Sequence, residues 1–388
     1  MRRLRMRLSL LSLLLLLFLT ACTNGVFKGS STSIVLTPSF ALGQPDFDTT
    51  TANGGASGLN RPFGVFVLNT QLFVSDASNH RILVWDTLPT TFGQAADRVV
   101  GQTSFTGTNA NQGGSTNGDT LSSPGGIFAT DTLGGFLYVA DQNNNRAVIY
   151  NFPLATTGEF ATSVVGQIGF NGNGSGTAAA QMNAPIGVAA GGGNLYVSEI
   201  TNNRILVFGS ETPSTGTAAS LVLGNSTFTS AASGTSSTRF TNLFNIFLYS
   251  TRLFLADRSN CRVAIWSPLP NSANDLPAAA VLGQDDFVTG SCAGGNLEAN
   301  NFNDPKHIAT NGTYTFVSDA ADHRVLVYEG IPSGTQSAKY VIGQESFSDS
   351  GSGSGQYALN GPEGMAATST QFFLADANNN RVLVYNLP

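Results

Sequence analysis

The sequence predicts an all-β fold, a six-bladed β-propeller built from four-stranded antiparallel blades. Three observations lead to this prediction. A fourteen-residue stretch recurs six times, strands and turns dominate the composition, and the order of the strands allows the chain to close into a ring. Repeats at a fixed period indicate an array of similar units, and four antiparallel strands per unit are typical of propeller blades.

The recurring stretch has two apolar runs joined by a few residues rich in Asn, Ser and Ala. An acid ends the first run, and an arginine follows five positions later, directly before the second run. Two such runs with a short polar connection predict a hairpin. The six copies begin at Leu72, Leu137, Leu195, Leu253, Thr315 and Phe372.

Each unit also contains two further apolar segments. One follows a proline and usually a glycine, as in Pro62-Phe63-Gly64. The other carries Gly-Gln and a phenylalanine three residues on, as in Gly43-Gln44 with Phe47. We name the strands A (after the proline), B and C (the hairpin) and D (the Gly-Gln strand). We expect the glycine to permit a bulge or a close backbone approach, the phenylalanine to pack between blades, and the glutamine to hydrogen-bond across blades.

The order of elements predicts how the ring closes. The repeat begins with a D strand near Ile34 and ends just after a C strand, at residues 381–387. We therefore expect the first strand to complete the last blade, which removes an unpaired sheet edge.

The composition agrees with this fold class. Only 11% of the 388 residues are charged, and 44 are glycine. Such a chain is better suited to many short strands joined by turns than to helices.

The amino terminus is interpreted as a targeting segment. Four arginines precede an apolar run from Leu8 to Leu19, and small residues lead to Cys22. A basic region followed by a short apolar run is typical of an export signal. The stretch Leu19-Thr20-Ala21-Cys22 resembles the lipobox of bacterial lipoproteins. The resemblance implies cleavage of residues 1–21 and acylation of Cys22. The alternatives are an ordinary secretory signal or a short membrane helix.

Residues 22–33 are then the lipidated cysteine and a flexible tether, and residues 34–388 are the propeller. Several acyl chains give firm membrane anchoring, whereas one chain alone is marginal. Because Thr23 rather than Asp follows the cysteine, the lipoprotein sorting pattern implies the outer membrane if the bacterium is Gram-negative. The expected location is the cell envelope.

Charge excludes one class of partner. Removing residues 1–21 takes away four arginines and leaves 14 basic side chains against 24 acidic ones, a net charge of −10. No cluster of Lys and Arg is present, and nucleic-acid binding requires one. We therefore expect no nucleic-acid partner.

With Cys22 assigned to the lipid, Cys261 and Cys292 form an even pair in an exported, oxidising setting, where a disulfide is the default interpretation. The topology supports this pairing, because the first lies in a B–C turn and the second in the next D–A loop. The alternative is two free thiols.

The strand after the proline and the two hairpin runs resemble NHL repeats of six-bladed β-propellers. The resemblance covers residues 34–388. It implies the fold, and it implies little about the activity.

A residue type that recurs in all six blades is interpreted as scaffold. This includes the acid and arginine of the hairpin, which we expect to bridge the B–C turn. His80 and His323 occupy a turn position that is asparagine or cysteine in the other copies, so we interpret them as turn residues.

The D–A loops vary most, and variable loops on a rigid scaffold often carry binding residues. We therefore predict that their face is the working face, with loops at residues 48–61, 106–123, 171–184, 229–242, 288–304 and 348–361.

Departures from the repeat are the candidate site. Lys306 and His307 replace the residues after the fifth proline, Asn245 lies where the fourth A strand lacks its proline, and Glu363 occupies the middle position of the sixth. We expect these residues near the mouth of the central channel. One His and one carboxylate are a thin ligand set for a divalent cation, so neither a metal nor a cofactor is predicted.

The function predicted from these observations is a non-catalytic binding or scaffold module with a protein or glycan partner. The alternative is a propeller enzyme similar to the six-bladed lyases and lactonases, with a metal at the channel mouth. No nucleophile elbow, zinc-protease motif or phosphate-binding loop occurs. A purely structural role in the envelope is a third possibility.

Overall fold

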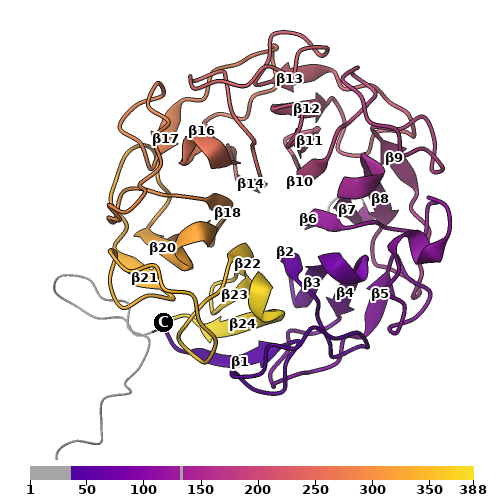
Figure 1. Cartoon of the computed structure of the whole chain (residues 1–388). Coiled ribbons are helices and arrows are strands. Elements are labelled where there is room, and N and C mark those ends of the chain that lie inside the picture. Colours follow the sequence, from indigo (N-terminus) through magenta and orange to yellow (C-terminus); the bar gives the residue numbers. More distant parts are fainter. Residues whose placement is uncertain (1–35, 132–133) are drawn as a thin grey trace, which may run out of the picture.

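The computed structural model describes residues 36–131 and 134–388, and Figure 1 shows them as a closed ring of six blades. Each blade is a four-stranded antiparallel sheet. The fold class predicted from the sequence is confirmed. The predicted signal segment, Cys22 and the tether lie outside the described residues. Within the described part of the chain, no helix is long and apolar enough to cross a membrane.

The strands follow one order in the first five blades, from the inner A strand to the outer D strand (Figure 1). Blade 1 contains β2 (Pro62–Leu68), β3 (Gln71–Asp76), β4 (Arg81–Trp85) and β5 (Arg98–Val100). Blade 2 contains β6 (Pro124–Thr130), β7 (Phe136–Asp141), β8 (Arg146–Asn151) and β9 (Ser163–Val165). Blade 3 contains β10 (Pro185–Gly191), β11 (Asn194–Glu199), β12 (Arg204–Phe208) and β13 (Leu221–Leu223).

The remaining blades complete the ring. Blade 4 contains β14 (Ile246–Tyr249), β15 (Arg252–Asp257), β16 (Arg262–Trp266) and β17 (Ala280–Leu282). Blade 5 contains β18 (Pro305–Thr310), β19 (Tyr314–Asp319), β20 (Arg324–Glu329) and β21 (Tyr340–Ile342). Blade 6 contains β22 (Pro362–Ala367), β23 (Gln371–Asp376), β24 (Arg381–Asn386) and β1 (Pro38–Leu42). Short 3-10 turns are η1 (Ala77–Asn79), η2 (Ala110–Gly113), η4 (Gln142–Asn144), η5 (Arg258–Asn260), η6 (Ala320–Asp322) and η7 (Ala377–Asn379).

The ring closes as predicted. Strand β1 pairs antiparallel with β24, with Leu42 opposite Val382 and Pro38 opposite Tyr385. The last blade therefore takes its outer strand from the start of the repeat array.

The hydrophobic core is divided into six clusters, each lying between two neighbouring blades. The phenylalanine of each Gly-Gln element packs against one of these clusters, as Phe47 does between blades 5 and 6 and Phe170 between blades 1 and 2. The predicted packing of these phenylalanines between blades is confirmed. Burial of apolar surface holds the ring together at every blade junction.

The glutamine of that element does not hydrogen-bond across blades, and this prediction was wrong. Gln102 donates to the carbonyl of His80 in its own blade and to that of Asn109 in the following loop. The chain folds this way because Gly101, with φ +87, brings the glutamine back beside the B–C turn. The glutamine therefore ties the start of a D–A loop to the turn of its own blade.

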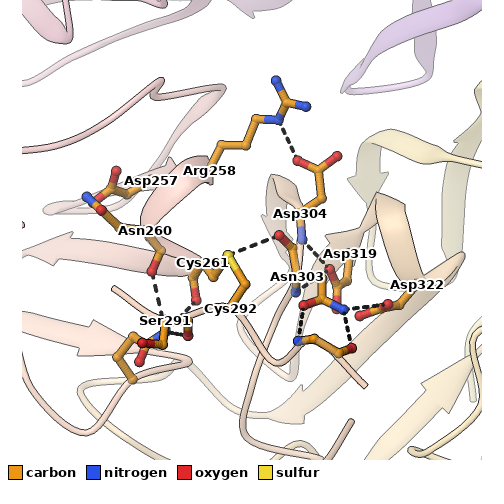
Figure 2. The surroundings of a disulfide bond; sticks show 12 residues. Asp257, Arg258, Asn260, Cys261, Ser291, Cys292, Asn303, Asp304, Asp319 and Asp322 are labelled. Carbon is orange, nitrogen blue, oxygen red and sulfur yellow. Dashed lines mark hydrogen bonds and ion pairs between the residues drawn. A yellow bond between two sulfur atoms is a disulfide. The ribbon is translucent and has the colours of Figure 1, made fainter. Parts of the chain in front are cut away.

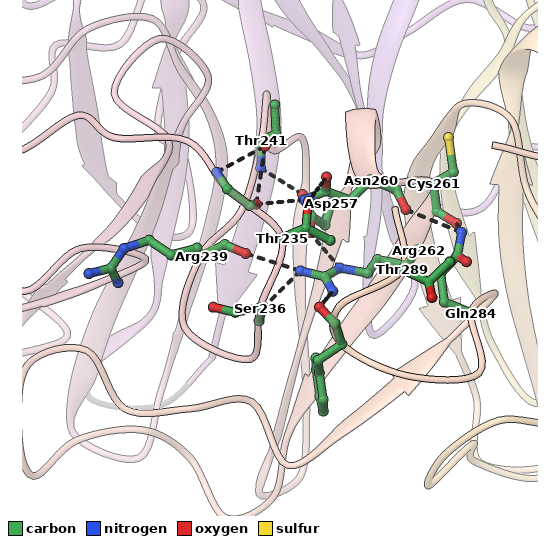
Figure 3. Close-up of polar contacts among 12 residues, drawn as sticks. Thr235, Ser236, Arg239, Thr241, Asp257, Asn260, Cys261, Arg262, Gln284 and Thr289 are labelled. Atoms are coloured by element: carbon green, nitrogen blue, oxygen red, sulfur yellow. Dashed lines mark hydrogen bonds and ion pairs between the residues drawn. The ribbon is translucent and has the colours of Figure 1, made fainter. Parts of the chain in front are cut away.

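Each buried arginine of the hairpin links the B–C turn to two D–A loops. Figure 3 shows these contacts for Arg262. Arg262 binds Asp257 through Nε at 2.7 Å, and its other nitrogens donate to the carbonyls of Phe287, Ser236 and Arg239. The predicted bridge across the turn is confirmed, and the loop contacts extend it. The D–A loops and the B–C turns share one face, as predicted, because these arginines contact both.

The acid completes the network. Oδ1 of Asp257 accepts from the backbone N–H of Thr241, and Oδ2 accepts from the Asn260 amide at 2.9 Å. Both members of the ion pair are fully buried. A buried charge is tolerated only when it is paired and hydrogen-bonded, and the full set of donors meets that condition.

We predict that Arg146→Met lowers the free energy of unfolding by about 3–5 kcal/mol, since it leaves Asp141 buried without its partner. The carbonyls of Asn117 and Thr120 also lose their donors. Urea unfolding of the purified protein measures this change.

The matched control is Arg98→Met. Arg98 and Asp86 form an ion pair at 2.8 Å with both side chains partly exposed, so its loss should cost about 1 kcal/mol or less. Equal losses in the two variants would contradict the scaffold role of the buried pair.

Candidate functional site

Five of the six blade junctions share one hydrogen bond on the D–A face, which we call the clasp. The residue that closes each B–C turn has a left-handed backbone, and its side chain accepts this bond. The donor is the backbone N–H of a residue just before the next A segment. The donor and acceptor pairs are Arg61 to Asn380, Ser123 to His80, Ala184 to Asn145, Asn242 to Asn203 and Gly361 to His323. His80 and His323 accept through Nδ1, so the prediction that they are turn residues is confirmed.

The sixth junction, between blades 4 and 5, is different. Cys261 occupies the turn position and forms a disulfide with Cys292 (Figure 2). The predicted bridge is confirmed. Because the sulfur atom is used in the covalent bond, the disulfide replaces the clasp, and it joins the turn of blade 4 to the loop that leads into blade 5.

Asp304, which occupies the donor position of the clasp at this junction, does not make that hydrogen bond. Its backbone N–H donates to Asp319 of its own blade instead. Its carboxylate accepts from Nε of Arg258 at 2.5 Å (Figure 2). The same carboxylate lies 3.4 Å from Nζ of Lys306. A salt-bridge network therefore forms at the one junction where the regular hydrogen bond is missing.

An open depression lies beside this network. Its volume is about 370 Å³, and its lining combines the disulfide with polar side chains. The lining residues are Asn242, Arg258, Ser259, Cys292, Asn303, Asp304 and Ala321.

The channel mouth next to the depression is formed by the second residue of each A segment. These residues are Phe63, Gly125, Ile186, Phe244, Lys306 and Glu363. The rings of Phe63 and Phe244, from opposite blades, lie 5.4 Å apart, and Ile186 belongs to the same apolar cluster. The channel is therefore closed at this level by apolar side chains.

Lys306 and Glu363 complete the ring on blades 5 and 6. Nζ of Lys306 lies 4.0 Å from the centre of the Phe244 ring, a cation–π contact. Oε1 of Glu363 lies 3.8 Å from the Arg61 guanidinium, and Oε2 has no hydrogen-bond partner among the described residues. Burial lowers the pKa of Lys306 and raises the pKa of Glu363, and in each case neighbouring opposite charges reduce the shift.

Asn245 lies one residue deeper in the channel. Glycine fills the equivalent position in four blades, and a Cβ atom on Gly187 would lie only 2.6 Å from Oδ1 of Asn245 and 2.7 Å from the backbone nitrogen of Ile246. The inner strands approach too closely for another side chain there. Asn245 therefore fills the space that the glycines of blades 2 and 3 leave open.

His307 occupies the same deeper position in blade 5. It is buried, its ring packs edge-on against Phe247 with centroids 6.0 Å apart, and Nδ1 has no hydrogen-bond partner among the described residues. Burial lowers the pKa of His307 to about 3. The imidazole is therefore neutral at physiological pH.

The four residues predicted from the departures fall into two layers. Lys306 and Glu363 are close enough to influence each other's ionisation at the mouth, whereas Asn245 and His307 lie in the layer below. Among the described residues, no group of three or more His, Cys, Asp and Glu side chains could hold a metal. The possibility that these four residues form one functional site stays a prediction.

Sequence reasoning missed Arg61, Arg258 and Asp304, which belong to the same charged cluster. A signal was present for two of them. Asp304 replaces residues that carry a left-handed backbone in the other blades, and Arg258 is the basic residue at a turn position that is Ala, Gln or Ile elsewhere.

No protein-family profile matches this sequence, and no curated protein sequence matches it. Solved structures resemble its fold. An auxiliary nutrient binding protein from Bacteroides thetaiotaomicron superposes with a TM-score of 0.53 and 12% identity, over 90% of this chain and 75% of that chain.

Two further structures are similar. A protein of unknown function from Bacteroides thetaiotaomicron has a TM-score of 0.52 and 11% identity, over 92% of this chain and 79% of that one. A virginiamycin B lyase from Staphylococcus aureus has a TM-score of 0.45 and 11% identity, over 87% and 98%. At these identities the likeness shows the propeller fold alone.

We predict that the neutral His307 makes the protein less stable in acid. The unfolded chain binds a proton near pH 6.5 and the folded protein only near pH 3, so each pH unit between these values costs up to about 1.4 kcal/mol. This stability is fully present above pH 6.5 and is lost as the pH falls.

The comparison variant is His307→Asn, which carries the residue found at this position in blade 4. Its unfolding free energy, measured by urea titration from pH 7 to pH 4, should fall less steeply than that of the wild type. Parallel curves for the two proteins would show that His307 is not buried in the neutral form.

Proposed function

We propose that this chain is a lipid-anchored, non-catalytic binding propeller of the cell envelope, with NHL-type repeats, which binds a protein or glycan partner through its D–A face. In a Gram-negative bacterium it would be held in the outer membrane through Cys22. The export and lipidation motifs support the location.

One observation carries the binding role. The ring is regular at five junctions, and the departures from the repeat gather on the D–A face at the junction of blades 4 and 5. The disulfide, the Arg258–Asp304 pair and the open depression are all found there. This is the one junction of the ring where the regular hydrogen bond is replaced and its donor residue pairs elsewhere, so it is the best supported place for recognition.

The enzyme alternative requires a metal at the channel mouth. Three cations, Arg61, Arg258 and Lys306, surround the two carboxylates of that region. Their charges oppose the binding of another cation. The structure therefore gives no reason to prefer this alternative, and the nutrient-binding protein of similar fold is in keeping with a binding role.

The test is capture of envelope components by the full chain, purified in detergent. Arg258→Met removes the side chain at the special junction, and Arg252→Met is the matched control, since Arg252 begins β15 at the A–B connection on the opposite face. We expect the same partner to be captured by the wild type and the control and to be lost in the Arg258 variant.

Fractionation of cells that express the protein tests the proposed lipid anchor at Cys22. Cys22→Ala should move the protein from the membrane fraction to the soluble fraction. Partner capture that is unaffected by Arg258→Met would contradict binding at this face. A stoichiometric metal in the purified protein, lost in His307→Ala, would favour the enzyme.

A further inference from the structure

The basic side chains of this acidic chain are unevenly distributed. Six arginines are buried in the blades as partners of the hairpin acids. Of the seven other Lys and Arg residues in the described part of the chain, three converge on the channel mouth. These three are Arg61, Arg258 and Lys306.

The three cations form one cluster with two acids, Asp304 and Glu363, so the cluster carries one excess positive charge. Lys306 and Arg258 bind opposite oxygens of the Asp304 carboxylate and lie over the same Phe244 ring, at 4.0 and 5.7 Å.

Only one of the three nitrogens of the Arg258 guanidinium has a hydrogen-bond partner within the described part of the chain. Nε binds Asp304, whereas neither terminal nitrogen has a partner among the described residues, and about a third of the side chain is exposed. Two adjacent free N–H groups in a fixed plane match the geometry of a carboxylate.

The rest of the depression offers neutral polar groups. The side chains of Asn242 and Ser259 line it and make no hydrogen bond within the described part of the chain. An amide and a hydroxyl beside a free guanidinium suit a ligand that carries several hydroxyl groups together with one acid group.

We propose that the depression at the junction of blades 4 and 5 binds an acidic sugar, with the carboxylate on Arg258 and the hydroxyls on Asn242 and Ser259. Arg61 and Lys306 add long-range attraction to the anion. The inference rests on the proposed binding function and names its ligand class as an acidic glycan.

Calorimetric titration of the full chain in detergent with sodium D-glucuronate tests this inference. We expect glucuronate to bind, D-glucose to give no measurable heat, and Arg258→Met to weaken glucuronate binding at least tenfold. The affinity should fall as salt is added, because the contact is partly exposed. Arg239→Met is the control, since Arg239 pairs with Asp275 away from the depression, and it should bind like the wild type.

Equal binding of glucose and glucuronate, or unchanged binding in Arg258→Met, would overturn the inference. So would binding of tri-glutamate in place of glucuronate, which would indicate an acidic protein segment. These results differ from failure of the proposed function, because partner capture that still depends on Arg258 would show that the face binds something else.

A second inference comes from the turn of blade 5. In the other five blades, an asparagine three residues after the hairpin acid donates its amide N–H to that acid at 2.7–2.9 Å. Blade 5 has Asp322 at this position. The residues that donate in the other blades are Asn79, Asn144, Asn202, Asn260 and Asn379.

The substitution leaves an unmet hydrogen bond. Oδ2 of Asp322 is buried and has no hydrogen-bond partner among the described residues, although it lies 3.7 Å from the Arg324 guanidinium. Oδ1 accepts from the Asn303 amide. In the other blades the equivalent atom is an N–H donor directed at the acid.

The charge balance of this turn also indicates that one proton is retained. Each of the other turns contains one buried acid and one buried arginine, which balance. Two ionised aspartates beside Arg324 would leave an excess negative charge in a buried site, and such a charge is costly. One retained proton restores both the balance and the missing donor.

We infer that Asp319 and Asp322 share one proton at neutral pH, so that a carboxyl O–H replaces the asparagine N–H of the other blades. The pair faces Arg324, the backbone N–H groups of Asn303 and Asp304, and the Asn303 amide.

Other titratable groups near the pair are already occupied or neutral. The Asp304 carboxylate is held by Arg258 and Lys306, and Nδ1 of His323 accepts from Gly361. Tyr328 is buried nearby, and burial raises its pKa. Burial, and then the like charge of Asp322, raise the pKa of Asp319 to about 7, although Arg324 opposes this shift.

The sign of the pH effect follows from the retained proton. The folded protein holds it up to about pH 7, and the unfolded chain releases it near pH 4, so the stabilisation is present at low pH and is lost as the pH rises through 7. Asp322→Asn, which restores the repeat, should weaken this dependence, because it removes the like charge while the burial of Asp319 remains. Urea unfolding from pH 5 to pH 8 measures the effect.

Asn379→Asp installs the same pair in blade 6 and should add a second dependence of the same sign. Burial also raises the pKa of Glu199 to about 7, so the infrared readout is the difference between two proteins. The band of a protonated carboxyl at pH 6 should be weaker in Asp322→Asn than in the wild type. Identical pH profiles of wild type and Asp322→Asn, or an infrared band of unchanged intensity, would overturn the inference.

Discussion

The buried pair of acid and arginine in each hairpin turn is the interaction on which the D–A face depends. A loop of more than a dozen residues without regular structure is ordinarily mobile. Here one guanidinium donates to carbonyls of two successive loops while its charge is neutralised in the turn, as Arg262 does for the loops before and after blade 4. The loops are therefore fixed by the same residues that define the blades, and polar groups on them keep defined positions.

A ring held in this way has two sets of residues with separate tasks. The repeated residues supply the fold. Substitutions at these positions lower the free energy of unfolding strongly, because each acid and arginine is buried and hydrogen-bonded. Chemistry is left to positions where one copy differs, such as Cys261, Asp304 and Asp322, and these lie side by side at one junction. Since Phe63 and Phe244 close the channel, a partner of the kind proposed would contact the rim of the mouth rather than enter the ring.

The sequence was sufficient for the blades because the same pattern of apolar runs, acid and arginine appears six times. It also identified the closing strand and the cysteine pair, since both follow from the order of the elements. The hydrogen-bond partners of the polar residues that repeat in each blade could not be predicted in this way. Gln102 illustrates the reason, because its direction depends on the backbone at Gly101 and not on any periodicity. The exchange of Asn for Asp322 was visible in the alignment of the copies, but its meaning requires the burial of the turn.

Strand β1 has a consequence for the order in which the protein can fold. Its side-chain contact from Asn386 to Ser39 spans 347 residues, so the first strand made has to wait for the last strand to be synthesised. Contacts between distant parts of a chain form slowly, because loop closure carries an entropy cost that grows with separation. The inner hairpins can form early, but blade 6 is assembled last. Until then, β1 has no partner strand, and any factor that binds an exposed strand edge would act on the protein in this interval.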